Sequence, residues 1–400
     1  MDVAFVTNVV YPFVTGGAQK RVHEIGTRLA DRGHDVTIYG RHYWDGPAEM
    51  AHEGMTLRAV ADAADLYEEE GRRSITEAID FSVRLLPPFA RQVDDHDVVV
   101  ASVFPYFPVL SSRLATLLRD VPLVTVWHEV WGADYWDDYL GRLALGGKVV
   151  ERLTAAVPQH PIAVSGVTAD KLARMGMGPR RADIEVVPNG IDVDQIRSAP
   201  LPDTSHRRDG EPGFDVLFAG RLIADKRVDV LLDAFDRVAE AHDATLGIVG
   251  EGPELDHLRE RAAGLSNADR VTLLGFLDEY EDVLGQMRAA RVFASASTRE
   301  GFGISCAEAM AADCTVVAAD HPDSAASEVV GDGGFLVDPT VEAFARALDD
   351  ALSGARPPTP PTTRAERFDW DAVATRAEER YRRAVDGEVD DPDVETGATN

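Results

Sequence analysis

The sequence predicts an α/β protein with two doubly wound parallel sheets, one in each half of the chain. Short apolar runs of strand length alternate with amphipathic helical patterns in both halves. The 400 residues, 45% of them hydrophobic, suffice for two separate cores. A stretch with Pro, Ser and Gly, Arg197–Gly213, has the composition of a linker between the halves. Two domains of similar architecture are therefore expected.

The chain is strongly acidic, with 69 Asp and Glu residues against 40 Lys and Arg residues and a formal charge of -29. That charge argues against nucleic acid or an anionic membrane surface as an electrostatic partner. Lysine occurs only at Lys20, Lys148, Lys171 and Lys226. Acidic residues spread along the whole chain are typical of a protein from a salt-filled cytoplasm. An ordinary acidic enzyme with a disordered tail is the alternative.

Nothing in the sequence has the spacing of a metal site. Cys306 and Cys314 are the only cysteines, and no clustered histidines accompany them. Reduced core cysteines, no metal and no cofactor are expected. No basic segment precedes a long apolar run at the N-terminus, and no apolar run approaches the roughly 20 residues that span a bilayer. We expect a cytoplasmic protein, and peripheral contact with the inner face of the cell membrane is left open.

The first half opens with a strand, a glycine loop and a helix. Val3–Thr7 is a short apolar run, and the loop after it ends in Gly16-Gly17. Apolar residues at helical spacing then continue to a stop at Gly33, and Val36–Tyr39 is the next strand. Glycines at the start of this helix let its backbone approach a phosphate closely.

Further strands are expected in the first half at Asp97–Val103, Val121–Val126, Pro161–Ser165 and Ile184–Val187. Pro105–Leu110 is expected to be a proline-broken loop, and the acidic stretch Trp44–Ser74 yields no assignment. The segment Trp127–Tyr139 holds three Trp and two Tyr residues. Aromatic faces pack on sugar rings and lipid chains, so these rings either border a site for such a molecule or pack in the core.

The second half alternates strands and helices again. The expected strands are Phe214–Ala219, Ala244–Val249 and Val271–Leu274, and the expected helices are Val228–His242, Glu254–Ala263, Asp278–Ala290 and Val341–Leu352. After the connector Pro357–Thr363, an amphipathic helix runs from about Phe368 to Arg383. The predicted organisation is a first domain 1–196, a linker 197–213, a second domain 214–356, a connector and final helix 357–385, and an acidic, disordered tail 386–400.

Two cations follow the first strand of the second half. Gly220-Arg221 stands at the strand end, and Lys226 comes five residues later, before a helix. Arg and Lys beside a helix start suit a diphosphate, although two solvated basic residues would give the same pattern. The turns Gly250-Glu251-Gly252 and Gly275-Phe276 follow the next two strands. By itself a G-x-G pattern is a weak signal that usually marks only a turn.

The stretch Ala294–Asp320 combines a buried strand, a Glu-Gly-Phe-Gly turn, an apolar helix and a second buried strand. Glu300 lies in the turn, and Glu308 lies about two helical turns beyond it. A helix opening at Gly303 directs free N–H groups at the turn, where an anion or sugar hydroxyl could bind. Ligands of open parallel sheets bind at this end of the strands. Without a ligand, the pair would be an N-terminal charge and a solvated surface residue.

This stretch resembles the Glu-x7-Glu signature of the retaining glycosyltransferases of family 4, which have the GT-B fold of two Rossmann-like domains facing a cleft. The segment GRLIADKRVDVLLDAF resembles the phosphate segment of that family, and the residues from Gly250 to Pro253 resemble its G-x-G-P segment. Gly16-Gly17, LADRGHDVTIYG and VPNGID resemble its opening loop, the sequence after that loop and the motif that closes its first domain. The resemblance covers nearly the whole chain and is densest from Phe214 to Pro339.

The resemblance implies a function and a set of site residues. The implied reaction moves a hexose from a nucleotide diphosphate sugar to a glycan, lipid-linked or small-molecule acceptor, without a metal. The final helix would cross back to the first domain. Arg221 and Lys226 would bind the diphosphate, Glu308 the ribose, and Glu300 with His128 the transferred sugar. The other implied donor-binding positions are Gly16, Gly17, Gly250, Glu251, Gly275, Phe276, Gly301, Phe302, Gly303 and Ile304.

Two alternatives stay open: a non-catalytic nucleotide-sugar-binding subunit of a glycosylation complex, and a nucleotide-sugar epimerase on the same fold. A phosphorylase is disfavoured because no lysine follows Lys226. The chain also departs from the family pattern. The usual small-Gly-x-Pro is here Ala312-Asp313-Cys314-Thr315, and the usual Gly-Gly-x-x-Glu is replaced by residues 321–328, which contain no glycine.

Overall fold

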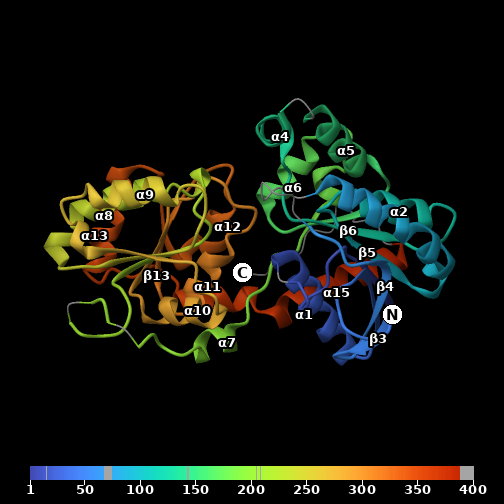
Figure 1. Ribbon diagram of the computed structural model, residues 1–400, viewed down its shortest axis with the longest axis horizontal. Helices are drawn as coiled ribbons and strands as arrows, with labels where there is room; N and C mark the ends of the chain where they lie inside the picture. Colours follow the sequence, from blue (N-terminus) through green and yellow to red (C-terminus); the bar gives the residue numbers. More distant parts are fainter. Residues whose placement is uncertain (15, 67–73, 142–143, 204, 208, 388–400) are drawn as a thin grey trace, which may run out of the picture. The chain divides into compact units, whose positions relative to one another are not determined.

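The computed structural model describes residues 1–14, 16–66, 74–141, 144–203, 205–207 and 209–387 (Figure 1). Chain contacts divide these residues into two compact units. The second unit is Asn189–Ala372, and the described residues on either side of it form the first. This division comes earlier than the expected boundary at residue 196, because helix α7 (Val193–Ser198) packs against α10 and α11 of the second unit.

The described part of the first unit contains one sheet in the order β3-β4-β2-β1-β5-β6-β7-β8. Its neighbouring strands are parallel except for the antiparallel pair β3 and β4. The strands are β1 (Asp2–Val6), β2 (Asp35–His42), β3 (Glu49–His52), β4 (Met55–Asp62), β5 (Val98–Ser102), β6 (Leu123–Trp127), β7 (His160–Ala163) and β8 (Glu185–Val186). The helices are α1 (Gly17–Asp31), α2 (Ile75–Gln92), α3 (Phe107–Thr116), α4 (Gly132–Leu140), α5 (Ala144–Ala156) and α6 (Gly166–Ala173).

Helices cover both faces of this first sheet (Figure 1). The helices α2, α3 and α5 pack against one another on one side, while α1 packs on β2 and β4. The last helix, α15 (Trp370–Asp386), runs beside α1, and the Phe5 ring of β1 contacts Tyr381 of α15 edge to face. Central strands such as β5 and β6 are buried along their whole length, as their unbroken apolar runs predict.

The described residues of the second unit form a parallel sheet in the order β11-β10-β9-β12-β13-β14. Its strands are β9 (Val216–Ala219), β10 (Leu246–Val249), β11 (Val271–Gly275), β12 (Val292–Ser295), β13 (Thr315–Ala319) and β14 (Gly334–Val337). Its helices besides α7 are α8 (Val228–His242), α9 (Leu255–Ala263), α10 (Tyr280–Ala289), α11 (Ile304–Ala311), α12 (Ala326–Val330), α13 (Val341–Leu352) and α14 (Pro361–Ala365). The helices α8, α9 and α13 lie on one face, and α10 and α11 lie on the other (Figure 1).

The predicted fold class and most predicted elements are confirmed. Helices α8 and α13 have the predicted bounds. The predicted loop Pro105–Leu110 is wrong, because α3 begins within it at Phe107. One of its two prolines, Pro108, lies in the first helical turn, where the missing N–H would have had no helical partner.

Several elements lie where the sequence yielded no assignment, among them β3, β4 and α2. The hairpin of β3 and β4 occupies Glu49–Asp62, within the unassigned acidic stretch. Helix α2 has a signal that was missed: the Ser74 hydroxyl accepts a hydrogen bond from the Glu77 backbone N–H at 3.3 Å, as in a Ser-x-x-Glu capping box. Of the predicted acidic tail, residues 388–400 lie outside the described chain.

Candidate active site

The site in the second unit lies where the strand order reverses. Strand β9 pairs with β10 on one side and with β12 on the other. Strands β9 and β12 are therefore neighbours, and the loops that follow them leave the sheet in different directions. Open α/β sheets bind ligands in the crevice beyond two such strand ends. These loops are tied together, since the Asp225 carbonyl accepts a hydrogen bond from the Thr298 backbone N–H at 2.9 Å. Sequence reasoning did not identify Asp225, whose contribution is a backbone oxygen.

Lys226 and Glu300 meet across these two loops. Lys226 ends a short 3-10 turn after β9, and Glu300 lies in the turn after β12. The Lys226 ammonium donates a hydrogen bond to Oε1 of Glu300, and both side chains are largely buried. The predicted phosphate-binding cation and the predicted sugar-binding carboxylate thus belong to one cluster. The ion pair holds the two side chains together between the loops.

The loop after β9 is packed so closely against the loop after β10 that glycine is required. A Cβ at Gly250 would lie 1.9 Å from the Gly220 carbonyl oxygen, and one at Gly252 would lie 2.2 Å from the Leu222 carbonyl oxygen. Both residues have positive φ, 136° and 157°. Arg221 is exposed just beyond the end of β9, and its side chain has no hydrogen bond or ion pair to the described residues. A free guanidinium at a strand end remains available to an anion.

Glu308 is buried in α11, with only 5% of its surface exposed. The Tyr280 hydroxyl of α10 donates a hydrogen bond to Oε1 of Glu308. Burial first, and then the charge of Glu308, raises the pKa of Tyr280 well above its ordinary value. The tyrosine therefore stays protonated and can only donate to the carboxylate. Tyr280 lay inside a predicted helix, and no sequence signal marked it as a partner of Glu308.

The turn between β12 and α11 has a fixed shape. Gly303, with φ 90°, is the N-cap of α11. The first N–H groups of α11 therefore point toward the turn, as predicted. Phe302 is buried, and its ring contacts the Phe368 ring edge to face with centroids 5.4 Å apart. Gly301 is partly exposed, and Ile304 is 39% exposed. The buried phenylalanine fixes the turn, while its neighbours remain accessible.

Gly275 and Phe276 lie at the end of β11, next to the glycine loop after β10. The Gly250 backbone N–H donates to the Gly275 carbonyl at 2.8 Å. The Phe276 side chain is 65% exposed, and Glu251 is also exposed. An exposed aromatic ring beside the cationic loop offers a flat apolar surface for a base.

The predicted site residues of the first unit lie on β1–α1 and β6. Gly16 and Gly17 are exposed at the start of α1, and no side chain of the described residues caps this helix start with a hydrogen bond. His128 follows β6, and a small cavity beside it is lined by Arg21 and Tyr381 among others. Burial, with a lesser effect of the Arg21 charge, lowers the pKa of His128 to about 3. His128 is therefore a neutral imidazole at physiological pH.

Arg21 was not predicted. It is 2% exposed and donates hydrogen bonds to the Val187 carbonyl at 3.1 Å and to the Pro188 carbonyl. It thereby anchors the start of the VPNGID motif on α1. Nothing in the sequence distinguished Arg21 from the adjacent basic residue Lys20.

Two of the five rings in the aromatic segment Trp127–Tyr139 belong to the core, and the other three are partly exposed. Trp127 is fully buried, and Trp136 is 6% exposed. The buried carboxylate of Glu151 accepts hydrogen bonds from the Trp136 indole at 2.9 Å and from the Trp131 backbone N–H at 2.8 Å. These contacts favour the core-packing alternative for Trp127 and Trp136.

The two cysteines of the second unit, Cys306 and Cys314, are buried and free, as expected.

No helix within the described ranges is both long enough and apolar enough to cross a membrane.

Comparison with known proteins agrees with this architecture. Residues 15–195 match the family model described as glycosyltransferase family 4, and residues 205–367 match the model described as glycosyl transferases group 1. Phosphatidyl-myo-inositol mannosyltransferase of Mycobacterium tuberculosis is 35% identical, over 91% of this chain and 92% of that protein. Glycogen synthase of the same species is 27% identical, over 97% of this chain and 96% of that protein.

A solved structure of HepE from Anabaena in complex with UDP covers 95% of this chain and 99% of its own, with a TM-score of 0.68 and 20% identity. Two Rossmann-like parallel sheets with this similarity define a protein of the GT-B class. Within that class, the chain belongs to the glycosyltransferases of family 4. Its second half matches the group 1 model.

Proposed function

We propose that the protein is a retaining glycosyltransferase that moves a hexose from a nucleotide diphosphate sugar to a glycan, lipid-linked or small-molecule acceptor. The observation that carries this proposal is the cluster of Lys226 and Glu300 at the reversal point of the second sheet. The names of two relatives, a mannosyltransferase and a glycogen synthase, support hexose transfer. The UDP complex of HepE supports a nucleotide donor.

In this proposal the second unit binds the donor. Arg221 and Lys226 bind the diphosphate, and Glu308 accepts hydrogen bonds from the ribose hydroxyls. Gly250, Glu251, Gly275 and Phe276 border the base. Glu300 and the backbone of Gly301–Gly303 hold the transferred sugar, with Phe302 and Ile304 shaping that turn. The first unit binds the acceptor, with Gly16, Gly17 and neutral His128 on the donor side.

The proposed chemistry breaks the bond between the anomeric carbon and the diphosphate oxygen. The acceptor hydroxyl forms a new bond to the same face of that carbon, and its proton passes to the departing diphosphate. Negative charge develops on the leaving group while the sugar becomes cationic. Arg221 and Lys226 stabilise the leaving diphosphate, an effect of several kcal/mol where water is excluded. Arg suits the two phosphates because its planar fork binds two oxygens at once.

The first test is calorimetric titration, in molar KCl, with the diphosphates of uridine, guanosine, adenosine and thymidine. We expect one of them to bind and Lys226→Ala to abolish or strongly weaken that binding. Arg237→Ala is a matched control, since Arg237 forms an exposed ion pair with Glu342 on the same unit. A folded protein that binds none of the four would contradict the proposal.

Product analysis with the donor sugar so identified then separates the alternatives. A transferase consumes donor in proportion to product glycoside, and a retaining one yields a product with the donor's anomeric configuration. An epimerase would change the sugar with no acceptor present. A non-catalytic subunit would bind donor without transfer or hydrolysis across a wide acceptor panel.

We also propose that the protein is adapted to high salt. The net charge of -29 and the presence of only four lysines support this. Dialysis into low salt removes screening of the acidic surface, so self-repulsion is expected to unfold the chain. Retention of the native circular dichroism spectrum at millimolar salt would contradict the proposal.

A further inference from the structure

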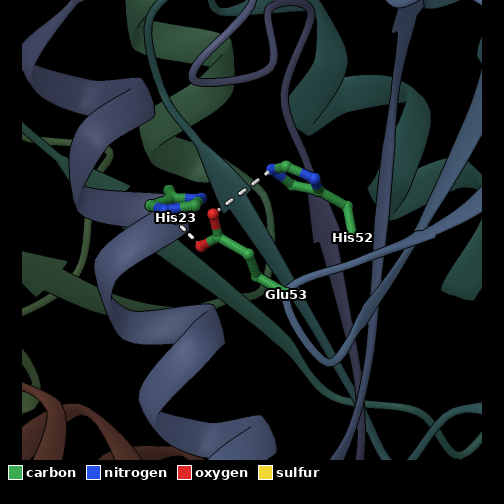
Figure 2. Close-up of side chains that lie close together, drawn as sticks. All are labelled: His23, His52 and Glu53. Carbon is green, nitrogen blue, oxygen red and sulfur yellow. Dashed lines mark ion pairs between the residues drawn. The ribbon is translucent and has the colours of Figure 1, made fainter.

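Tertiary structure brings together three polar side chains of the first unit that no sequence pattern linked. His23 lies on α1, while His52 and Glu53 lie at the tip of the β3–β4 hairpin. Figure 2 shows the Glu53 carboxylate between the two imidazole rings. The His23 Nε2 atom is 3.1 Å from one Glu53 oxygen, and the His52 Nε2 atom is 3.8 Å from the other. The ligand atoms of all three residues lie within 4.8 Å of one another.

The hairpin places Glu53 at a position that a glutamate rarely occupies. His52 and Met55 are cross-strand partners, so Glu53-Gly54 is a two-residue turn. Both turn residues have positive φ, 47° and 77°, as in the type I′ turn that favours Asn, Asp or Gly. A left-handed conformation costs other residues about 1 kcal/mol or more. This turn directs the Glu53 carboxylate at His23. The cost of the left-handed backbone is offset only if that carboxylate makes a strong interaction.

One ring nitrogen that faces the cluster, Nε2 of His52, is buried without a hydrogen-bond partner among the described residues. A buried polar atom without a partner costs roughly 1–3 kcal/mol. His52 Nε2 faces the Glu53 carboxylate, too far away for a hydrogen bond, so an atom bound between them would satisfy it.

We propose that His23, His52 and Glu53 form a binding site for a divalent transition metal, with Zn²⁺ as its best-suited ion. Two imidazole nitrogens and one carboxylate are a common zinc donor set that leaves one coordination position open. Mg²⁺ and Ca²⁺ prefer oxygen ligands and do not fit two imidazoles. Around a tetrahedral zinc the ligand atoms are separated by roughly 3.3 Å. The exposed Glu53 and the hairpin tip need to move only slightly to reach that separation.

A metal here would fix the loop that leads into α1. The Tyr11 ring contacts the His23 ring with centroids 4.8 Å apart, and the Phe13 ring contacts His52 with centroids 5.6 Å apart. Both aromatic residues belong to the loop between β1 and Gly16. The metal would join α1, the β3–β4 hairpin and, through these rings, that loop. This inference does not depend on the proposed sugar transfer.

The sequence expectation of no metal followed from spacing alone, because His23 and His52 do not stand in a short ligand motif. The His23 ring also lacks support beyond the ligands, since its Nδ1 atom has no acceptor within the described chain. Such support changes metal affinity by about 10–100-fold. We therefore expect a site weaker than a fully supported zinc centre, and one that a chelator empties readily.

The experiment uses the full chain, stripped with a chelator, in molar KCl. Zn²⁺ affinity is measured by competition with a chromophoric chelator, and Co²⁺ is added separately to record the visible spectrum of its site. The variants are His52→Ala and Glu53→Gln, both at the exposed hairpin tip, so the fold should survive. His257→Ala is the control, because His257 is an exposed histidine of the second unit.

We expect one Zn²⁺ per chain in the wild type and in the control, with at least 10-fold weaker binding in both hairpin variants. Zn²⁺ should also raise the thermal midpoint of the wild type and the control by a few degrees and leave the variants unchanged. Equal Zn²⁺ affinity in wild type and both variants would overturn the proposal. Wild-type binding too weak to compete with the chelator would overturn it as well and leave His23 and Glu53 as an ion pair only.

Discussion

Lys226 and Glu300 form an ion pair although they are 74 residues apart in the chain. Each follows a strand that borders the reversal point of the second sheet, so the pair forms only when β9 and β12 lie side by side. The pair holds a cation and an anion at the predicted donor position. In the proposed complex, Lys226 would bind the donor diphosphate and Glu300 would bind the transferred sugar.

Lys226→Ala and Glu300→Gln should each abolish most sugar transfer without unfolding the protein. Each removes a charge that the proposed transition state needs, and the loss of one such group typically costs about 100-fold or more in rate. The measurement is donor consumption together with circular dichroism. The exposed pair variant Arg237→Ala should retain wild-type turnover. Wild-type turnover in Lys226→Ala would remove this residue from the proposed site.

Glu308→Ala should weaken binding of the nucleoside diphosphate by roughly 10-fold or more, because hydrogen bonds to a charged acceptor contribute about 1.5–3 kcal/mol. Tyr280→Phe should have a smaller effect, since it removes a donor to Glu308 and leaves the carboxylate in place. Calorimetric titration of both variants checks this order. A larger loss in Tyr280→Phe than in Glu308→Ala would show that the tyrosine, and not the glutamate, binds the ligand.

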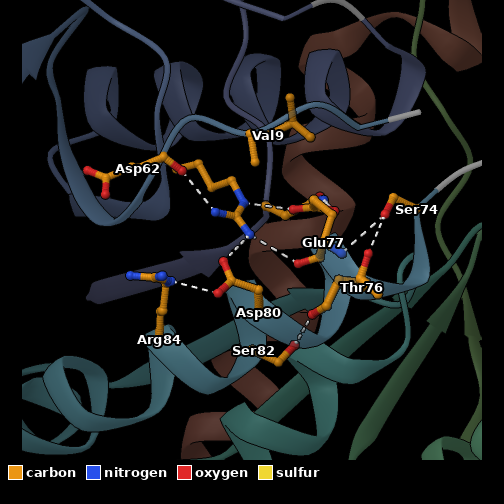
Figure 3. Close-up of polar contacts among 12 residues, drawn as sticks. Val9, Asp62, Ser74, Thr76, Glu77, Asp80, Ser82 and Arg84 are labelled. Carbon is orange, nitrogen blue, oxygen red and sulfur yellow. Dashed lines mark hydrogen bonds and ion pairs between the residues drawn. The ribbon is translucent and has the colours of Figure 1, made fainter. Parts of the chain in front are cut away.

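A buried ion pair in the first unit should control stability rather than activity. Arg41 is 2% exposed and donates to the Glu77 carboxylate at 2.7 Å, to the Asp62 carbonyl at 2.8 Å and to Asp80 at 2.9 Å. Figure 3 shows Asp62, Glu77 and Asp80 in this network. The guanidinium thus links β2 to the end of β4 and the first turns of α2.

Arg41→Met should lower the free energy of unfolding by about 3–5 kcal/mol, because it leaves the Glu77 carboxylate buried without its cation. Urea unfolding in molar KCl measures the loss. Arg84→Ala is the control: Arg84 also binds Asp80, but both side chains are about half exposed, so solvent screens this pair and its loss should cost far less than that of Arg41. Equal losses in the two variants would argue against a special role for the buried pair.

Because of Glu378 in α15, the free energy of unfolding should fall as the pH is lowered into the acidic range. Burial disfavours its charge, but hydrogen bonds from Arg32, His34 and Arg382 outweigh that effect and lower the pKa of Glu378 to about 2. The pKa is thus lower in the folded than in the unfolded chain. The stabilisation by Glu378 is therefore complete above about pH 4.5, its ordinary value, and is lost as the pH falls toward 2.

Glu378→Gln should destabilise the protein at pH 7 by roughly 1.5–3 kcal/mol, the range for hydrogen bonds to a charged group. The difference from wild type should shrink between pH 4.5 and pH 2. Urea unfolding at several pH values measures it. Glu379→Gln, at the neighbouring exposed residue, should change neither quantity. A pH-independent difference would mean that the charge of Glu378 is not what stabilises α15.

Asp313→Gly should stabilise the second unit. Asp313 has φ 67° directly after α11, and its N–H donates to the Met310 carbonyl at 3.1 Å while that of Cys314 donates to Ala309 at 2.9 Å. This is the Schellman arrangement, in which the left-handed residue is usually glycine. Glycine removes the strain of a side chain there and should add about 0.5–1 kcal/mol. Urea unfolding that shows no gain would mean that the Asp313 side chain offsets the strain.

The sequence by itself determined the local structure of most of the chain. Apolar periodicity located the helices α8 and α13 with their bounds, and the departure from the family pattern at Asp313 coincides with a left-handed residue. These features depend on neighbours within a few residues, so a linear pattern contains them. The α2 helix could also have been predicted from its Ser74–Glu77 capping box.

The tertiary structure alone decided which distant side chains meet. Strand β12 follows β11 in the sequence but pairs with β9, and this order places Glu300 against Lys226. The same holds for Tyr280 with Glu308, and for His23 with the hairpin tip at Glu53. Strand order is set by how whole sheets and helices bury their apolar faces together. No local pattern encodes it, so the residue types were visible in the sequence while their partners were not.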